Sequence, residues 1–380
     1  MDALIGGSLA AFIIYAAAKW KVDDKKKIQH TFENIGYKVG DHTPRLIKTH
    51  KTETYTTYTY NVPFGLVDDD KLEVLEKVLN KPVKVSFANQ KLHIKAYKEK
   101  LKDNYNYDLF ESKGNWTIPV GMSQEGIIYH DFDQVPHMTV AGATTWGKTV
   151  FMKMLMTHLI EINPNGVEFY MLDLKGALAF HRYSNLKQVK AVAGNHKESA
   201  NALKIVEKSV KNDMKEFKKI YAENAKEANI PTRKFIIIDE AGELVPDKTM
   251  SDDDKEHSKT CQRILSYIAR VSGQLGYKLI FGTQYPTADI LNNQIKANSL
   301  AKVSFRLSTS VQSNVALDQS GAETLECPGR AIYKTVDEHK VQTPFISNKE
   351  IWDKLRRYEI NDDPTTEETT EGREDTVTFG

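Results

Sequence analysis

An eight-residue loop between an apolar segment and an amphipathic one constrains the fold of this chain most. Residues 142–149 read Gly-Ala-Thr-Thr-Trp-Gly-Lys-Thr and fit the pattern G-x-x-x-x-G-K-[ST] at every fixed position. The apolar run 138–141 predicts a strand before the loop, and the run 150–162 predicts a helix after it. In such a loop, backbone N–H groups and the helix N-terminus surround phosphate oxygens. The order of strand, loop and helix therefore predicts a phosphate-binding site in an α/β fold.

The loop residues have separate predicted roles. Lys148 is expected to reach the β and γ phosphates of ATP, and the Thr149 hydroxyl to hold Mg²⁺. ATP and Mg²⁺ are accordingly the predicted cofactors. The predicted nucleotide-binding residues are Gly142, Ala143, Thr144, Thr145, Trp146, Gly147, Lys148 and Thr149.

Two further apolar strands end in polar side chains that complete an ATP-hydrolysing site. Residues 235–238 are followed by Asp239, expected to hold Mg²⁺, and Glu240, expected to activate the attacking water. Residues 279–281 lead to Gln284, a predicted catalytic residue that senses the γ-phosphate. The alternatives are that the two acids only cap a turn, and that Gln284 makes an ordinary hydrogen bond at a strand end.

The chain around these motifs alternates strands with helices. Such alternation, with strands that are apolar without interruption, predicts a doubly wound α/β sheet covered on both faces. The acidic loop 246–258 is interpreted as a solvated insertion. The expected strands are 138–141, 168–172, 235–238, 278–281 and 301–307, and the expected helices are 150–162, 199–221 and 261–275.

The preceding segment has the pattern of a small α+β domain. Residues 54–60 consist only of Thr and Tyr and predict a strand, and residues 69–79 have helical periodicity. The runs 83–87 and 92–96 predict two more strands. The predicted division is an anchor at 1–22, a juxtamembrane segment at 23–37, the small domain at 38–118, the ATPase at 119–350 and an acidic tail at 351–380.

The first residues favour a single transmembrane helix. Residues 3–18 carry no charge, and Lys19 and Lys21 follow them. Sixteen helical residues span about 24 Å, which Trp20 and the lysines can extend toward the roughly 30 Å of a bilayer core. Positive charge after the apolar run predicts a cell-membrane protein with its body in the cytoplasm. A signal peptide and a buried helix are the alternatives.

The formal net charge of +1 conceals an uneven distribution. Residues 361–380 contain seven acids and one base, so the rest of the chain carries +7. The tail is therefore predicted to be disordered, and the near-neutral total does not exclude nucleic acid. Two cysteines, Cys261 and Cys327, cannot form a disulfide framework and are expected to be reduced.

Beyond the phosphate loop, several short motifs resemble the FtsK/SpoIIIE family of DNA-pumping ATPases. They occur in the family's order across residues 117–335. The matching segments are Val135–Thr144, Ile236–Glu240, Gly282–Pro286, Ile295–Asn298, Leu317–Glu323 and Pro328–Ala331.

This resemblance implies a RecA-like motor core that works as a ring, expected to be a hexamer, around duplex DNA. It also suggests Lys296 as a DNA contact and Arg270 as a catalytic arginine finger acting on a neighbouring subunit, with Arg306 as the second candidate. Surface lysines and arginines more commonly serve solvation or salt bridges, which is the alternative for all three. Gly273 stands where the family often has a second arginine, and Thr145 and Trp146 replace its usual small Gly-Ser pair.

With one predicted span and no domain after the motor, the chain resembles the compact FtsK-type coupling ATPases of Gram-positive conjugative or mobilisable elements. The expected function is a membrane-anchored, ATP-driven translocase of plasmid or mobile-element DNA. Its expected partners are double-stranded DNA, or single-stranded DNA during transfer, together with a relaxase and a membrane transfer channel. The alternatives are an ATPase of plasmid or chromosome segregation and a protein-secretion ATPase of the type VII kind.

Overall fold

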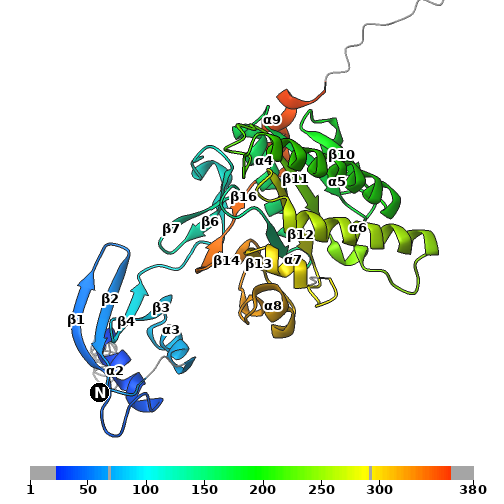
Figure 1. The fold of residues 1–380 in the computed structure, drawn as a ribbon. Helices are drawn as coiled ribbons and strands as arrows, with labels where there is room; N and C mark the ends of the chain where they lie inside the picture. The colour runs from blue at the N-terminus through cyan, green and yellow to red at the C-terminus, as the bar shows by residue number, and fades with distance from the viewer. Residues whose placement is uncertain (1–22, 67–69, 291–292, 361–380) are drawn as a thin grey trace, which may run out of the picture. The chain divides into compact units, whose positions relative to one another are not determined.

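A computed structural model describes residues 23–66, 70–290 and 293–360 and divides the chain into two compact units. The small unit ends at Leu101 and the larger unit begins at Lys102 (Figure 1). This division lies before residue 118, where the sequence suggested the end of the small domain. Residues 102–118 are part of the larger unit because strand β5 (Tyr105–Asn106) pairs with β16 (Pro344–Phe345).

The small unit is a four-stranded antiparallel sheet packed against helices. Strands β1 (Arg45–Lys51), β2 (Tyr55–Asn61), β3 (Val83–Ala88) and β4 (Lys91–Tyr97) lie in the order β1-β2-β4-β3. Helix α2 (Asp24–Asn34) and helix α3 (Val74–Leu79), which follows a 3₁₀ turn at Asp70–Glu73, share a core with the sheet.

Helix α2 is an integral part of this small unit. Its Ile28 and Phe32 are fully buried and pack with Tyr58 and Tyr60 of β2. The sequence suggested a separate juxtamembrane segment at 23–37, whereas the buried apolar face of α2 contributes to the domain core. The predicted transmembrane residues 3–18 lie outside the described residues. Among the residues that are described, no helix is long and apolar enough to span a bilayer.

The larger unit contains a ten-stranded sheet with the order β10-β9-β11-β12-β8-β13-β14-β15-β6-β7. The first six of these strands are parallel, and the last four extend the sheet in antiparallel fashion. The strands are β6 (Thr117–Ser123), β7 (Gly126–Asp131), β8 (Met138–Ala141), β9 (Val167–Leu172), β10 (Val189–Ala193), β11 (Arg233–Ile238), β12 (Tyr277–Thr283), β13 (Ala301–Phe305), β14 (Arg330–Lys334) and β15 (Glu338–Gln342).

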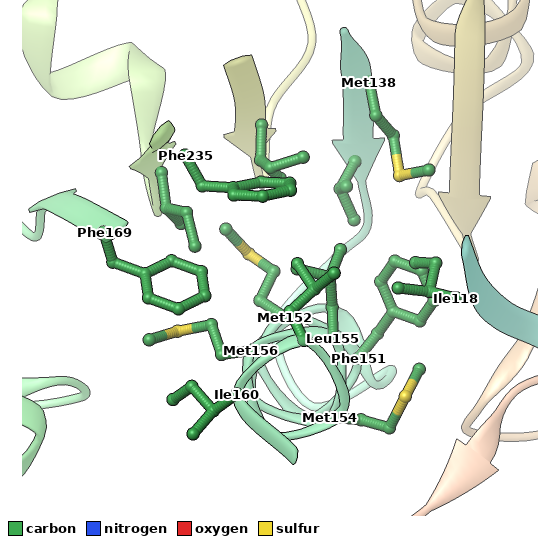
Figure 2. Close-up of a cluster of buried hydrophobic side chains, with 14 of the residues drawn as sticks. Ile118, Met138, Phe151, Met152, Met154, Leu155, Met156, Ile160, Phe169 and Phe235 are labelled. Atoms are coloured by element: carbon green, nitrogen blue, oxygen red, sulfur yellow. The ribbon is translucent and has the colours of Figure 1, made fainter. Parts of the chain in front are cut away.

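Helices cover both faces of the parallel part, as the apolar strands predicted. Figure 2 shows α4 (Lys148–Ile162) with Met152, Leu155 and Met156 packed toward Phe169 and Phe235 of the sheet. Alternate residues of the same strands, such as Tyr170 and Ile236, face α5 (His196–Lys219) and α6 (Asp252–Val271) in a second core. Helix α9 (Asn348–Leu355) packs on α4, which explains why α4 is buried almost all round. The predicted tail at 351–380 therefore begins too early, because Ile351, Trp352 and Leu355 of α9 are buried in the core.

The five strands expected for the motor are all present, as β8, β9, β11, β12 and β13. The structure corrects the interpretation of residues 246–258 as a loop, because α6 begins at Asp252. The Ser251 hydroxyl accepts a hydrogen bond from the Asp254 N–H, and three acidic residues occupy the first turn of the helix. Negative charge at a helix N-terminus is stabilising, so this acidic run starts α6. The remaining helices are α7 (Asn293–Asn298) and α8 (Ser310–Leu317).

Candidate nucleotide-hydrolysis site

The predicted site residues meet at the carboxyl ends of three parallel strands. Strand β12 lies between β8, which leads into the phosphate loop, and β11, which leads into the acidic pair. Thr283 of β12 is level with Ala141 of β8, and Phe281 of β12 is level with Ile238 of β11. Because the three strands end together, residues separated by about 140 positions in sequence are neighbours in space.

The phosphate loop has the backbone of a nest that turns into a helix. Gly147 has a φ of 114°, and a Cβ there would lie 3.1 Å from Phe305 and 3.2 Å from Gly329. Thr145 also has a positive φ, 72°, which is rare for a β-branched residue. Thr145 therefore adopts a left-handed backbone conformation that glycine would adopt more easily.

Trp146 is accommodated by packing inside the unit. Its partly buried ring lies against the core around α4, and the guanidinium of Arg306 is stacked 4.8 Å above it. Arg306 also donates a hydrogen bond to the Leu325 carbonyl. The second arginine-finger candidate is therefore engaged within its own subunit, where it supports the loop.

Lys148 and Asp239 form a buried ion pair at the centre of the site. The Lys148 ammonium lies 2.9 Å from Asp239 Oδ1 and also donates to the Asp239 carbonyl. Both residues are at most 5% exposed. Removing one partner of a buried pair leaves the other charge buried and uncompensated. The phosphate loop, through Lys148, and the end of β11, through Asp239, therefore stabilise each other.

Glu240 is oriented by the end of the neighbouring strand β12. Its carboxylate accepts hydrogen bonds from the Gln284 N–H at 2.9 Å and from the Thr283 hydroxyl at 3.1 Å. Lys175, from the turn after β9, lies 3.9 Å from the same carboxylate. The Thr144 hydroxyl of the phosphate loop donates to the side-chain oxygen of Gln284 at 3.1 Å. Gln284 therefore connects the phosphate loop to the acid that is predicted to activate water.

A cavity of about 610 Å³ opens beside these groups, large enough for a nucleotide. Its walls include the phosphate loop, Gln284 and two segments that were not predicted as site residues. These two segments are 327–329 and 342–345. Asp103 and Asn104 also line the cavity and were not predicted either.

A cluster of hydrogen bonds around Arg330 positions the part of the cavity wall that was not predicted from the sequence. Buried Arg330 donates to the Gln342 side-chain oxygen at 2.9 Å and lies 3.2 Å from Asp103 Oδ1. Gln342 in turn donates to the Pro328 and Asp103 carbonyls. The motif at 328–331 was visible in the sequence, but its contact with residues 103 and 342 depends on the pairing of β14 with β15.

The oxygen donors expected for Mg²⁺ are present. The Thr149 side chain lines the cavity, and the Asp239 carboxylate lies at the adjacent strand end. Hydroxyl and carboxylate oxygens are the ligands that this hard cation prefers, with phosphate oxygens and water completing its shell. Within the described residues, no cluster of three or more His, Cys, Asp or Glu side chains could hold a metal ion.

Arg270 lies away from this site. It is exposed in the last turn of α6, just before β12 begins, whereas the phosphate loop lies where β12 ends. Among the described residues it has no hydrogen bond or ion pair. At the nearby position 273, a Cβ would lie 2.6 Å from Pro136, so this fold has no room for the family's second arginine there. Arg270 can serve a catalytic role only toward another subunit.

Lys296 lies on α7, within an ion-paired group. Its ammonium is 2.9 Å from Asp318 Oδ1, and Lys302 contacts the other oxygen of the same carboxylate. The DNA-contact role remains a prediction, and it requires DNA phosphates to compete with Asp318 for this lysine.

Comparison with known proteins identifies relatives over most of the larger unit. Residues 100–285 match the model of the FtsK/SpoIIIE family. The DNA translocase FtsK of Listeria monocytogenes is 26% identical over 86% of this chain, and the DNA translocase SpoIIIE of Bacillus subtilis is 25% identical over 87%. The chain spans less than half the length of these two relatives, 46% and 44%.

Solved structures share the fold at lower identity. A structure of the pCW3 conjugation coupling protein TcpA, in monomer form with ATPγS, is 21% identical with a TM-score of 0.66, and the match covers 88% of this chain and 99% of that one. ATPases 2 and 3 of EssC from Geobacillus thermodenitrificans are 14% identical with a TM-score of 0.58, and the match covers 68% of this chain and 51% of that one.

Proposed function

Because the larger unit of this chain belongs to the FtsK/SpoIIIE family of P-loop ATPases, we propose that the protein is an ATP-driven DNA translocase. The observation that carries the proposal is that Lys148 and Gln284, which line one cavity, directly contact Asp239 and Glu240 behind them. These four side chains supply phosphate contact, metal ligation, water activation and a link between loops. DNA as the cargo is supported by the curated relatives, which are named DNA translocases.

ATP binding changes the partners of the buried ion pair. A triphosphate in the cavity would compete with Asp239 for the Lys148 ammonium, because Lys148 both lines the cavity and pairs with Asp239. Asp239 and Thr149 would then hold Mg²⁺, which would supply positive charge to stabilise the phosphates. The loop N–H groups and the N-terminus of α4 stabilise the remaining phosphate charge.

Glu240 is the proposed general base. It is 5% exposed, and hydrogen bonds from Thr283 and Gln284 fix the direction of its carboxylate. A fixed base that takes the proton of the attacking water contributes about 10²- to 10⁴-fold to a rate. Loss of the γ-phosphate changes what Thr144 contacts, and Gln284 transmits that change to the chain after β12. This segment leads toward Lys296, the proposed DNA contact.

The test is ATP turnover of the full chain with and without duplex DNA. We expect DNA to stimulate turnover, and Glu240→Gln to keep nucleotide binding while turnover falls about 100-fold or more. Glu243→Gln is the matched control, since Glu243 is an acid of the adjacent 3₁₀ turn, whereas the hydrogen bonds from Thr283 and Gln284 go to Glu240. Absence of DNA stimulation at every salt concentration, with Glu240→Gln as active as the control, would refute the proposal.

Conjugative transfer is the proposed setting. The fold shared with the TcpA structure extends over 88% of this chain and 99% of that chain, which supports this setting. A hexameric ring, an N-terminal single-pass anchor in the cell membrane, a relaxase and a transfer channel belong to this proposal. If residues 1–22 form the anchor, a chain that begins at residue 23 should move from the membrane to the soluble fraction. Mating assays with that truncated chain separate conjugation from segregation, because only conjugation requires transfer to a recipient.

Protein secretion is the second candidate, supported by the shared fold with the EssC ATPases. The two functions differ in what stimulates turnover. Stimulation by a secreted polypeptide, and none by duplex DNA, would favour secretion. The DNA-translocase relatives match a larger share of this chain, which is why DNA is preferred.

A further inference from the structure

Helix α5 carries a row of lysines along its exposed side. The helix packs against α6 and against the edge strand β10 (Figure 1). Residues three or four positions apart share one side of a helix, and lysines recur at that spacing over about 21 Å of α5. These five exposed residues, here called the lysine row, are Lys204, Lys208, Lys211, Lys215 and Lys218.

Two acidic side chains of α5 are engaged by neighbouring elements. Glu207 accepts two hydrogen bonds from the Arg263 guanidinium of α6, at 2.9 and 3.0 Å. Asp213 accepts hydrogen bonds from the Tyr277 hydroxyl of β12 at 2.5 Å and from the Lys234 ammonium of β11 at 3.2 Å. Both carboxylates therefore hold α5 against the rest of the unit.

The lysine row is left largely without neutralising partners. Lys211 pairs with Glu207 at 2.9 Å. The side chains of the other four members make no hydrogen bond or ion pair with any residue that the structure describes. The two remaining acids of α5 also bind elsewhere, since Glu198 accepts a backbone N–H before the helix and Glu216 pairs with Lys219, outside the row.

This arrangement is unfavourable for the helix in isolation. Each member of the row stands three or four positions from the next, so four successive pairs of like charge lie side by side along the helix. Like charges at that spacing destabilise a helix. A helix face that meets only water typically mixes both signs of charge. An anionic surface would relieve the repulsion along the whole row at once.

Exposed apolar side chains accompany the row and indicate which anionic surface it fits. Ile205 lies three positions before Lys208 and is 60% exposed, and Ile220 and Tyr221, directly after the helix, are 58% and 93% exposed. The phosphate backbone of a nucleic acid offers charge but little apolar surface. A bilayer offers both, since anionic headgroups attract lysine and the boundary with the acyl chains accepts Ile and Tyr.

We propose that the exposed side of α5 binds the surface of a bilayer that contains anionic lipid, through the headgroup phosphates. The straight helix lets all five lysines meet one flat surface, and Ile220 and Tyr221 enter the boundary below the headgroups. This contact goes beyond the proposed translocase activity and does not depend on residues 1–22 being an anchor. Because charge attracts the row, binding weakens as salt shortens the range of the attraction.

The experiment measures by mass spectrometry how fast individual lysines of the full chain are acetylated in the presence of vesicles. Vesicles of phosphatidylcholine alone are compared with vesicles that also contain phosphatidylglycerol. In the anionic vesicles we expect Lys208, Lys215 and Lys218 to react about tenfold more slowly, because the surface attracts and covers them. Lys187 and Lys340, exposed lysines of the larger unit outside α5, are the internal controls and should react equally in both. Salt at 1 M, where the screening length is about 3 Å, should remove the protection.

A double variant tests whether the row acts together. Each lysine near an anionic surface strengthens binding about fivefold, so Lys208→Gln/Lys215→Gln should weaken it about 25-fold and abolish the protection of Lys218. The control Lys187→Gln/Lys340→Gln removes the same charge from exposed positions outside α5 and should leave Lys218 protected.

The inference is wrong if the row reacts at the same rate in both kinds of vesicle, whether it is exposed in both or covered in both by another copy of the chain. It is also wrong if duplex DNA protects the row and anionic vesicles do not, since the row would then recognise nucleic acid. DNA-stimulated ATP turnover tests the translocase separately, and its absence does not change the protection expected here.

Discussion

The ion pair between Lys148 and Asp239 determines both nucleotide binding and stability at the centre of the site. Replacing Lys148 by Met removes the phosphate contact and leaves the Asp239 carboxylate buried without its partner. We expect ATP binding to be lost and the free energy of unfolding to fall by about 3 kcal/mol or more. Nucleotide titration and denaturant unfolding measure the two effects.

A double variant separates these two consequences. Lys148→Met/Asp239→Asn has no unpaired charge, so it should recover much of the lost stability and none of the ATP binding. If the double variant is no more stable than Lys148→Met alone, the pair does not have the structural role inferred from its burial.

For individual residues, sequence motifs predicted the chemically active side chains but not the residues around them. Glycine spacing and acids at strand ends are local patterns, so Lys148, Asp239, Glu240 and Gln284 could be named before the structure was known. Arg330 and Gln342 hold the 327–329 wall at the cavity, and Arg330 also reaches Asp103. Those contacts depend on strand order, which no local pattern encodes.

A buried cluster of charged side chains at strands β11 and β12 makes the free energy of unfolding depend on pH in the alkaline range. Lys278 is 2% exposed and lies 3.2 Å from Asp133, which Arg233 also binds through two hydrogen bonds. Burial lowers the pKa of Lys278 to about 8, despite the opposing charge of Asp133. The folded chain therefore releases a proton at lower pH than the unfolded chain, whose lysine retains its ordinary pKa near 10.5.

Because of this difference in pKa, the contribution of Lys278 to the free energy of unfolding should increase as the pH rises above 8. The unfolded state binds more protons than the folded state between pH 8 and 10.5, so this group's contribution to stability increases with pH, by at most about 3 kcal/mol. Lys278→Met should flatten that part of the curve between pH 8 and 9.5, and the exposed control Lys187→Met should not. Parallel curves for wild type and Lys278→Met would contradict the prediction.

Elements with long apolar runs were predictable, and elements defined by their partners were not. Phe235–Ile238 and Leu279–Phe281 are buried on both faces, so hydrophobicity alone indicated them. Strand β15 includes Glu338, His339 and Lys340 and was not predicted, because pairing with β14 holds it in the sheet. The acidic start of α6 was misread for a related reason, since Asp252–Asp254 indicate a helix only once Ser251 is seen to cap it.

For the larger unit as a whole, three buried histidines predict loss of stability in acid. Burial lowers the pKa of His130 to about 3 and those of His137 and His158 to about 4. In the unfolded chain they protonate near pH 6.5, so stability is fully present above that pH and declines as pH falls toward 4. The loss is roughly 2 kcal/mol per histidine at pH 5.

One substitution tests this assignment. His158→Gln keeps a hydrogen-bonding group beside the Tyr107 hydroxyl and removes one titrating ring. The fall in melting temperature of the larger unit between pH 7 and pH 5 should shrink by about one third, because one of three comparable contributions has been removed. An unchanged pH dependence would mean that other groups control acid unfolding.

The proposed ring predicts that neighbouring subunits share catalytic residues. Arg270 lies near the amino ends of the strands, whereas the nucleotide cavity lies at their carboxyl ends, so a catalytic arginine from α6 must act on a neighbour. A ring built this way should be poisoned by inactive subunits. If one dead subunit stops a ring of six, an equal mixture of wild type and Glu240→Gln retains about 2% of DNA-stimulated turnover, whereas independent subunits retain about half.

The measurement mixes the two proteins before nucleotide and DNA are added. Mixing them after assembly is the control and should leave about half of the activity, provided that formed rings exchange subunits slowly. Arg270→Gln should poison in the same way if it is the residue supplied to the neighbour. A strictly linear decline with the fraction of Glu240→Gln would show instead that the subunits turn over independently of one another.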